Sequence, residues 1–299
     1  MLRTLLLAAL IAVPAIARRP APPPDLGTLT LDRGDPAIDA TVAGIPARLA
    51  VALDARDTIE LAPSFAARPD LPWQPDSSEE IGRVSLPTRM AAGEVALGGV
   101  VAPTKLTTHD RPCCAGHDGE LGPLHLPWSI VRIGAGGGAE KRWPAVFDEQ
   151  SGLHIPWRTP AGTIRLILSP HAAETIATAS AAAILAKAYG AHFTGEGRSA
   201  PIAFGISRQV RDMVLDRPAP LLGFILQRIA VRYADFAGGR TLPSDAPDEG
   251  IVVRHRGPAS QHGWPAIAIG RDLLDRCPAI AVYRAGADGG PEIGLSCGG

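Results

Sequence analysis

Short apolar segments separated by glycine, proline and polar residues run through almost the whole chain. Half of those given below are four to eight residues long, which is typical of β-strands. They predict strands over 29–31, 40–42, 47–53, 95–97, 100–101, 130–133, 163–168, 210–215, 223–233 and 279–283. One helix is predicted over 177–189, which is rich in alanine and leucine and is followed by Gly190 as a helix-ending residue. The expected class is all-β with a few short helices.

A run of glycines, Gly134 to Gly138, lies close to the middle of the chain and is followed by the polar residues 140–142. Such a run is typical of a linker or hinge, and it has neither the lysine nor the spacing of a phosphate-binding loop. We therefore expect an N-terminal lobe over 18–139 and a C-terminal lobe over 140–299.

The first seventeen residues have the pattern of a secretory signal peptide. Arg3 precedes an apolar run over 5–13, and Ala15 and Ala17 form an A-x-A cleavage signal. An uncleaved anchor is the less favoured alternative, because the run is shorter than the roughly 20 residues of a membrane-spanning helix. No cysteine follows the cleavage point, which argues against a lipoprotein. We expect residues 1–17 to be removed and the mature protein to be periplasmic or secreted, without a membrane span.

The amino-acid composition and the charge balance exclude some classes of fold and function. The chain has 299 residues, with 33 Gly and 29 Pro, which argues against a helical bundle. Its 29 Lys and Arg nearly balance its 30 Asp and Glu. There is therefore no long-range positive field to attract a nucleic acid, and none is expected as a partner.

Four cysteines occur in two groups, and an exported protein can keep them oxidised. Cys277 and Cys297 flank the last predicted strand region, so a disulfide between them is expected to contribute about 3 kcal/mol. Cys113 and Cys114 are adjacent and have histidines nearby, yet the spacing is not that of a metal site. We expect a disulfide-bearing loop, with the vicinal and the long-range pairing both open. No metal and no cofactor is expected.

The two halves of the chain repeat each other. Residues 48–59 align without gaps on residues 165–176, with Arg, Leu, Ala, Thr and Ile recurring in register. Further along each half an apolar residue is followed by glycine, at Gly122 and at Gly270. Because both matches occur in the same order, they predict two related units.

These segments resemble the pepsin-like and retropepsin-like aspartic proteases. In each lobe of that family an apolar strand runs into Asp-Thr/Ser-Gly-Ala, and later comes an apolar-apolar-Gly turn, often followed by Arg-Asp and a short helix. Residues 49–59, 166–176 and especially 267–274 are similar to those pieces. The resemblance covers roughly 29–133 and 153–283. It implies an all-β, two-lobed aspartic-protease-like fold of the double-ψ β-barrel type, with a cleft between the lobes.

The catalytic pair of the family is missing from this alignment. Ala52 and Ser169 stand at the two aspartate positions, and Asp54 and His171 stand where the family has glycine. The chemistry requires two carboxylates that share one proton, which an alanine and a serine do not supply. In a shifted register Asp54 becomes the first aspartate, but residues 162–185 contain no aspartate to pair with it. A homodimer that pairs two copies of Asp54 is a less favoured alternative.

The favoured hypothesis is an exported aspartic-protease-like protein without peptidase activity. It would bind a peptide, a protein or another extended ligand in the cleft through strand edges. The residues expected at this cleft are Asp54, Asp57, Thr58, Gly122, His171, Thr175 and Gly270.

Two alternatives remain open. An atypical hydrolase could use Asp54, His171 or Glu174, although Ser169 lacks the G-x-S-x-G pattern of a serine hydrolase. A purely structural role in the cell envelope is the other. His117 and His262 occupy related places in the two halves and could contact a ligand, but loop histidines without a function are more common.

Overall fold

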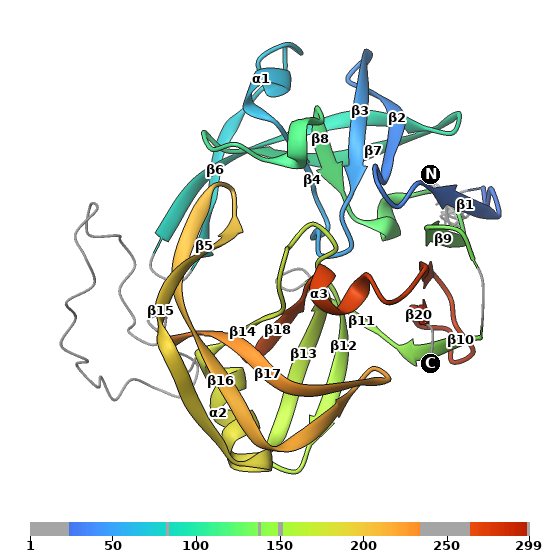
Figure 1. The fold of residues 1–299 in the computed structure, drawn as a ribbon. Coiled ribbons are helices and arrows are strands. Elements are labelled where there is room, and N and C mark those ends of the chain that lie inside the picture. The colour runs from blue at the N-terminus through green and yellow to red at the C-terminus, as the bar shows by residue number, and fades with distance from the viewer. Residues whose placement is uncertain (1–23, 82–83, 137–138, 149–151, 234–263, 298–299) are drawn as a thin grey trace, which may run out of the picture.

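The computed structural model describes residues 24–81, 84–136, 139–148, 152–233 and 264–297. These residues are mostly β-strand and form sheets of seven, eight and five strands (Figure 1). They also contain the helices α1 (Pro63–Ala66), α2 (Ala179–Tyr189) and α3 (Arg271–Leu274). The predicted β class is confirmed. No helix in the described ranges has the length and apolar character needed to cross a membrane. The predicted signal peptide over 1–17 and His262 lie outside the described residues.

The first sheet contains seven strands, and six of them close into a barrel because β2 also pairs with β6. Along β3 the buried and exposed positions alternate, with Leu49 and Val51 facing the core. The order of the sheet is β2 (Ala37–Val42), β3 (Ile45–Val51), β8 (Gly119–Leu121), β4 (Ile59–Leu61), β7 (Val100–Thr108), β6 (Val84–Leu97) and β5 (Gln74–Ile81).

The second sheet repeats this order and adds one strand. Its order is β11 (Val146–Asp148), β12 (Gly152–Thr159), β13 (Gly162–Leu168), β18 (Ala266–Ile269), β14 (Ile176–Thr178), β17 (Phe224–Arg232), β16 (Ile206–Leu221) and β15 (Ala191–Ala203). The sense of pairing is repeated too: β13 is parallel to β18 as β3 is to β8, and β14 is parallel to β17 as β4 is to β7. The repeat inferred from residues 48–59 and 165–176 thus extends over both sheets.

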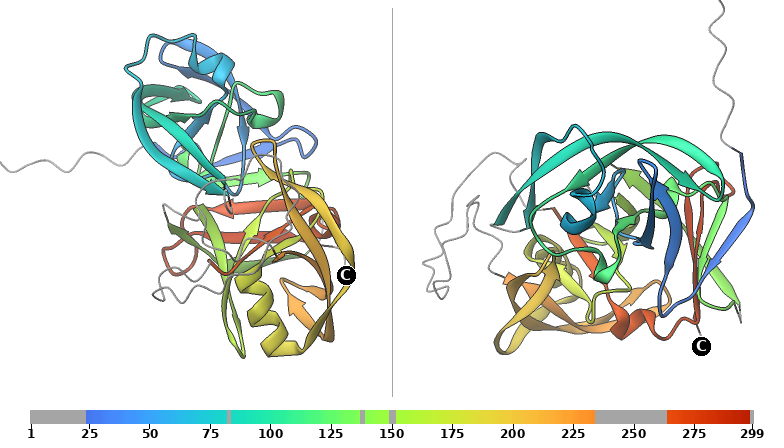
Figure 2. Two further views of the ribbon diagram at one scale, coloured as in Figure 1. Left: turned by 90° about the vertical axis from the view of Figure 1, so that its left-hand side faces the viewer. Right: turned by 90° about the horizontal axis from the view of Figure 1, so that it is seen from above.

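A third sheet joins strands from the two ends and the middle of the chain. Its order is β1 (Thr28–Leu31), β9 (Ile130–Ile133), β19 (Ala279–Tyr283), β20 (Glu292–Ser296) and β10 (Glu140–Pro144). All five residues of β19 are buried, as expected for a strand that is covered on both faces. Figure 2 shows this sheet beside the two larger ones, which lie one above the other.

Glu140 connects three strands of the third sheet. Its Oε1 accepts hydrogen bonds from Tyr283 Oη at 2.6 Å and from Arg142 Nε at 2.8 Å, and its Oε2 accepts one from Arg132 Nη2 at 3.2 Å. Burial alone would raise the pKa of Glu140, but these hydrogen bonds and charges outweigh it and hold that pKa below its ordinary value. The pKa of Tyr283 is raised, first by burial and then by its bond to Glu140.

Two local expectations need correction. The helix begins at Ala179 rather than at 177, because Ile176–Thr178 forms β14 and the Thr178 hydroxyl caps the helix by accepting from Ala181 N at 3.3 Å. Gly134 is not part of a free linker. It has a φ of 93°, and a Cβ there would lie 2.2 Å from the carbonyl oxygen of Pro278. The chain at Gly134 is therefore a packed turn between two strands of one sheet; residues 137–138 are not described.

β15, the outer strand of the long hairpin with β16, was not predicted, and neither was β5. Most side chains of β15 are exposed, so they do not form the apolar run by which the other strands were recognised. The strand also contains Pro201, and a proline within a run argues against a strand unless it lies at an edge. β15 and β5 are indeed the edge strands of their sheets.

Both cysteine groups are disulfide-bonded. Cys277 is bonded to Cys297 as predicted, and Cys113 is bonded to its neighbour Cys114, which decides between the two open pairings. Cys277 is fully buried and belongs to the main core cluster, as do Ile280 and Leu295 of the third sheet.

Replacing Glu140 by Gln should lower the free energy of unfolding at pH 7 by about 2 kcal/mol, since hydrogen bonds to a charged group are lost. Because the folded pKa of Glu140 is below its unfolded value, its contribution is present at neutral pH and disappears as the pH falls through the folded pKa. Urea unfolding at pH 7 and near pH 3 measures this. The exposed Glu94 on β6 provides the control: Glu94→Gln should change stability by less than about 0.5 kcal/mol. An E140Q deficit of the same size at both pH values would contradict the prediction.

Candidate functional site

Two corresponding turns, residues 52–58 and 169–175, leave the ends of β3 and β13. Ala52 N donates to Leu121 O at 3.0 Å, and Ser169 N donates to Ile269 O at 2.9 Å. Three residues later the backbone N–H of each turn donates to the carbonyl oxygen of that same first residue. Ala55 N donates to Ala52 O, and Ala172 N donates to Ser169 O. The structure therefore places Ala52 and Ser169 at equivalent backbone positions.

The carboxylate of Asp54 lies where the two turns meet. Its Oδ2 accepts a hydrogen bond from Ser169 Oγ at 2.7 Å, and His171 Nε2 lies 3.4 Å from the same oxygen. Ser169 is buried, the Asp54 side chain is 24% exposed, and the His171 side chain is 51% exposed. Asp54, Ser169 and His171 thus come together from both large sheets.

This centre contains one carboxylate and one neutral hydroxyl. A serine hydroxyl does not ionise near neutral pH, so Asp54 and Ser169 cannot divide the roles of acid and base as two carboxylates do. Ser169 also donates directly to Asp54, so His171 does not stand between them as it would in a Ser-His-Asp triad. The centre therefore consists of a partly exposed carboxylate, Asp54, that accepts a hydrogen bond from a buried hydroxyl, Ser169.

The glycines that were expected in the cleft have a packing role. A Cβ on Gly122 would lie 3.2 Å from Ala55 O, and one on Gly270 would lie 2.4 Å from the carbonyl carbon of Glu174. Gly152, which the sequence reading did not single out, has a φ of 64°, and a Cβ there would lie 2.6 Å from Ala55 O. These positions let neighbouring backbone approach the two turns closely.

Thr175 and Thr58, both expected at the cleft, have different surroundings. Thr175 is buried; its Oγ1 accepts from Gly270 N at 3.1 Å and donates to Asp272 Oδ1 at 2.7 Å, so it holds the turn in place. Thr58 lies at a small pocket, and its Oγ1 lies 3.1 Å from Thr107 Oγ1. Asp57 is half-buried and does not line that pocket.

Glu174 belongs to an ion-pair network rather than to the Asp54 centre. Its two carboxylate oxygens accept from Arg198 Nη1 at 2.7 Å and Nη2 at 2.5 Å. The hydrogen bonds that Arg198 donates to Glu174 raise the pKa of Arg198, and Asp212 contributes in the same direction. Of the three side chains considered for a hydrolase, the structure therefore brings together Asp54 and His171 only.

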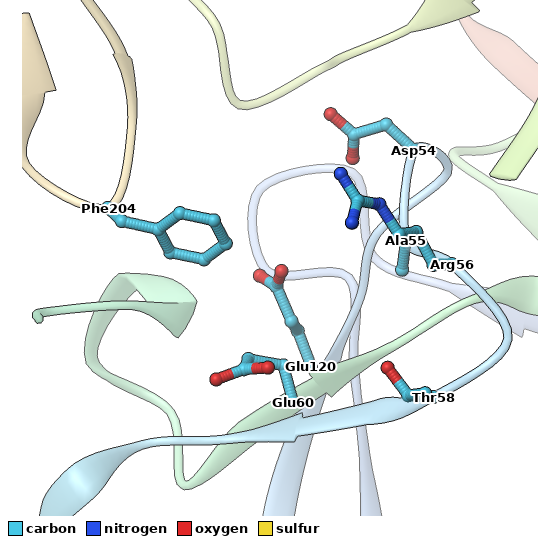
Figure 3. Close-up of a pocket in the computed structure, with 7 residues that line it drawn as sticks. All are labelled: Asp54, Ala55, Arg56, Thr58, Glu60, Glu120 and Phe204. Carbon is cyan, nitrogen blue, oxygen red and sulfur yellow. The ribbon is translucent and has the colours of Figure 1, made fainter. Parts of the chain in front are cut away.

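A pocket of about 70 Å³ opens beside Asp54. Figure 3 shows the Arg56 guanidinium next to the Asp54 carboxylate, with the carboxylates of Glu60 and Glu120 below it and the Phe204 ring opposite. The remaining lining residues are Ala55 and Thr58. Three carboxylates and one guanidinium give this pocket a negative formal charge.

Glu60 and Glu120 lie opposite each other on β4 and β8, in antiparallel register. Thr107 Oγ1 donates to Glu60 Oε2 at 2.6 Å and so fixes one carboxylate. Like charges at directly opposed positions destabilise a sheet, so the pair has a cost to folding. A charged residue between apolar neighbours in Ile59-Glu60-Leu61 was the available sequence signal, but the pairing with Glu120 was not visible without the fold.

Phe204 reaches this pocket from the other sheet, at the turn of the β15 and β16 hairpin. Its ring meets the ring of His109 edge-on, with centroids 4.3 Å apart. His109 follows β7, and burial lowers its pKa, so it is neutral at pH 7 and adds no positive charge here. No sequence signal pointed to Phe204.

Comparison of the sequence with models of protein families and with curated proteins finds no match. The function must therefore be inferred from the site itself. Two features of the site are available for this: a single hydrogen-bonded carboxylate at the turns, and an adjacent pocket of negative charge.

Replacing Ser169 by Asp tests the geometry of the turns. It would put a second carboxylate within hydrogen-bond distance of Asp54, and the two groups would then have to share a proton. The variant should lose about 2 kcal/mol of stability at pH 7 and recover most of it near pH 4, where one group is protonated. Thermal unfolding between these pH values measures the effect. S169N, which has similar size and no charge, should show no such pH dependence; equal profiles for the two variants would refute the proximity.

Proposed function

We propose that this chain is an exported aspartic-protease-like protein that lacks peptidase activity and binds an extended peptide ligand between its two large sheets. Ala52 and Ser169 at equivalent backbone positions carry the proposal, because neither supplies a carboxylate. The repeated strand order supports the two-lobed resemblance. Export rests on the pattern of residues 1–17.

The edges of the sheets support a peptide as the ligand. Among the described strands, β5 pairs with β6 alone and β15 with β16 alone, and an edge strand is where an added strand can pair. Phe204, on the hairpin that β15 begins, also lines the pocket. An extended chain along this edge could therefore place a side chain beside Asp54.

The charge of the pocket supports a basic side chain at that place. Asp54, Glu60 and Glu120 outnumber the single Arg56, and His109 is neutral. The Phe204 ring adds a surface on which a cation can lie, worth about 0.5–2 kcal/mol. We infer that a peptide with lysine or arginine is preferred over one with glutamate.

Incubating the purified protein with a random peptide library between pH 3 and pH 8 tests the absence of peptidase activity. We expect intact peptides at every pH, since no pair of carboxylates shares a proton at Ala52 and Ser169. Mass spectrometry of the library detects cleavage. Products whose formation is blocked by a transition-state mimic of aspartic proteases would overturn the proposal.

Binding is tested with peptides that are identical except for Lys, Gln or Glu at one position. Bound ligand raises the melting temperature of the folded form, and the Lys peptide should raise it most. Glu120→Gln should weaken binding of the Lys peptide roughly tenfold, or about 1.4 kcal/mol, whereas the exposed Glu94→Gln should leave it unchanged. Equal shifts for the Lys and Glu peptides would contradict the basic preference. No shift with any peptide would favour a purely structural role.

A hydrolase is the second candidate, favoured by the contacts of Asp54 with Ser169 and His171. Asp54 would act as the general base and His171 as the acid, which typically contributes 10²–10⁴-fold to a rate. Ester, peptide and glycoside substrates test it, with Asp54→Asn and His171→Gln compared to the unchanged protein. Turnover that both variants lose would favour this candidate over the binding protein.

A further inference from the structure

The disulfide between Cys113 and Cys114 lies in a segment that borders the pocket. This segment, residues 109–117, connects β7 to β8 and contains a short 3-10 helix, Cys114–Gly116. A disulfide stabilises a fold mainly by closing a long loop, and neighbouring residues close almost none. Cys277 and Cys297, twenty positions apart, form the stabilising type. The vicinal bond instead fixes the local conformation of its own two residues.

That local conformation is unusual for a residue with a side chain. Cys114 has a φ of 67°, in the left-handed region, which is unfavourable for a residue with a Cβ. Its carbonyl oxygen accepts from His117 N and lies 2.9 Å from His117 Nδ1. His117 Nε2 in turn lies 2.7 Å from Asp35 Oδ1. A change of backbone at Cys114 would therefore release the contacts that hold this segment to the first sheet.

Two contacts lead from the segment to the pocket. Cys114 Sγ lies 3.9 Å from the carbonyl oxygen of Glu60, whose side chain lines the pocket. The ring of His109, which is buried and neutral, contacts the Phe204 ring edge-on. Pro112 also borders the hairpin, because a Cβ on Gly205 would lie 4.0 Å from its Cδ. The disulfide segment thus touches both walls of the pocket.

The hairpin turn that carries Phe204 packs against a small apolar cluster. Phe204 and Gly205 have φ values of 51° and 69°, a type I′ geometry that favours Asn-Gly rather than a bulky side chain. Phe204 packs against Ile206 of its own hairpin and against Ile81, Val84 and Leu86 of the β5 and β6 hairpin, in a cluster separate from the main core. A region whose apolar contacts lie in such a small cluster opens locally at a lower free energy than the main core does.

We propose that the Cys113–Cys114 disulfide is a redox switch that closes the pocket when oxidised and opens it when reduced. A dithiol reductant supplies two electrons and two protons: the Sγ–Sγ bond breaks, two cysteine thiols form, and the reductant becomes a disulfide. Cys113 is half-buried, so an attacking thiolate can reach it. Cys114 can then leave the left-handed region, His109 separates from Phe204, and the hairpin turn moves away from the pocket.

Hydrogen exchange of the intact chain, followed by mass spectrometry, tests the switch without a ligand. The double variant C113A/C114A should exchange the amides of 109–117 and 203–208 at least tenfold faster than the oxidised protein, while those of 224–232 stay unchanged. C277A/C297A is the matched control, and it should speed exchange in the third sheet but not at 203–208. Unchanged exchange at 203–208 in C113A/C114A would overturn the switch, and so would a uniform loss of protection along the chain.

A second variant separates the switch from a general effect on folding. Phe204→Asn favours the same turn but removes the ring that contacts His109. It should open 203–208 with the disulfide intact, and adding C113A/C114A should then cause little further change. Additive effects would overturn the coupling between the disulfide and the hairpin.

Only the consequence for ligand binding rests on the proposed function. Reduction by dithiothreitol, with thiol labelling to confirm which cysteines are free, should raise the association rate of the Lys peptide severalfold. If 203–208 open on reduction but no peptide binds in either state, the switch stands and the proposed function fails. If the Lys peptide binds at the same rate in both states and 203–208 do not open, the switch fails and the proposed function stands.

Discussion

The parallel pairing of β3 with β8, and of β13 with β18, is the constraint on which the centre of the molecule depends. Two parallel neighbouring strands cannot be joined by a tight turn, so the chain must leave the sheet after β3, and again after β13, before it returns in the parallel strand. The turns that follow β3 and β13 are held by the backbone of the partner strand and by glycines that let it come close. In this arrangement a buried serine of one sheet meets a carboxylate of the other, and the hydrogen bond offsets the cost of partly burying that charge.

The strand class, the internal repeat and the Cys277–Cys297 bond could be predicted because each leaves a local or repeated signal in the sequence. β15 and β5, the outer strands of the two long hairpins, left none. These two strands carry polar and proline residues and lie at the edges of their sheets, where fewer side chains reach the core. Gly134, which was expected to belong to a linker, was misread for a related reason: its close approach to Pro278 is a long-range contact.

The site was predictable only in part. Asp54 and His171 were singled out from the aligned turns, and they do meet, whereas Glu174 was placed with them by closeness in sequence and instead pairs with Arg198. Glu120 and Phe204 needed the fold, since the first depends on strand register and the second on a hairpin from the other sheet. Chemistry that arises from pairings between distant segments cannot be recognised from spacing along the chain.

The third sheet has a consequence for how the molecule is made. β9 pairs with β1 on one side and with β19 on the other, and β19 belongs to the last part of the chain. Because the chain is synthesised from its N-terminus, β9 therefore remains an unpaired, apolar sheet edge until residues 279–283 have been made. Contacts across such a span form slowly, and an unfinished edge invites association with other chains. The final strands thus complete the first half of the molecule as well as the second, and a chain shortened at its C-terminus would be prone to aggregate.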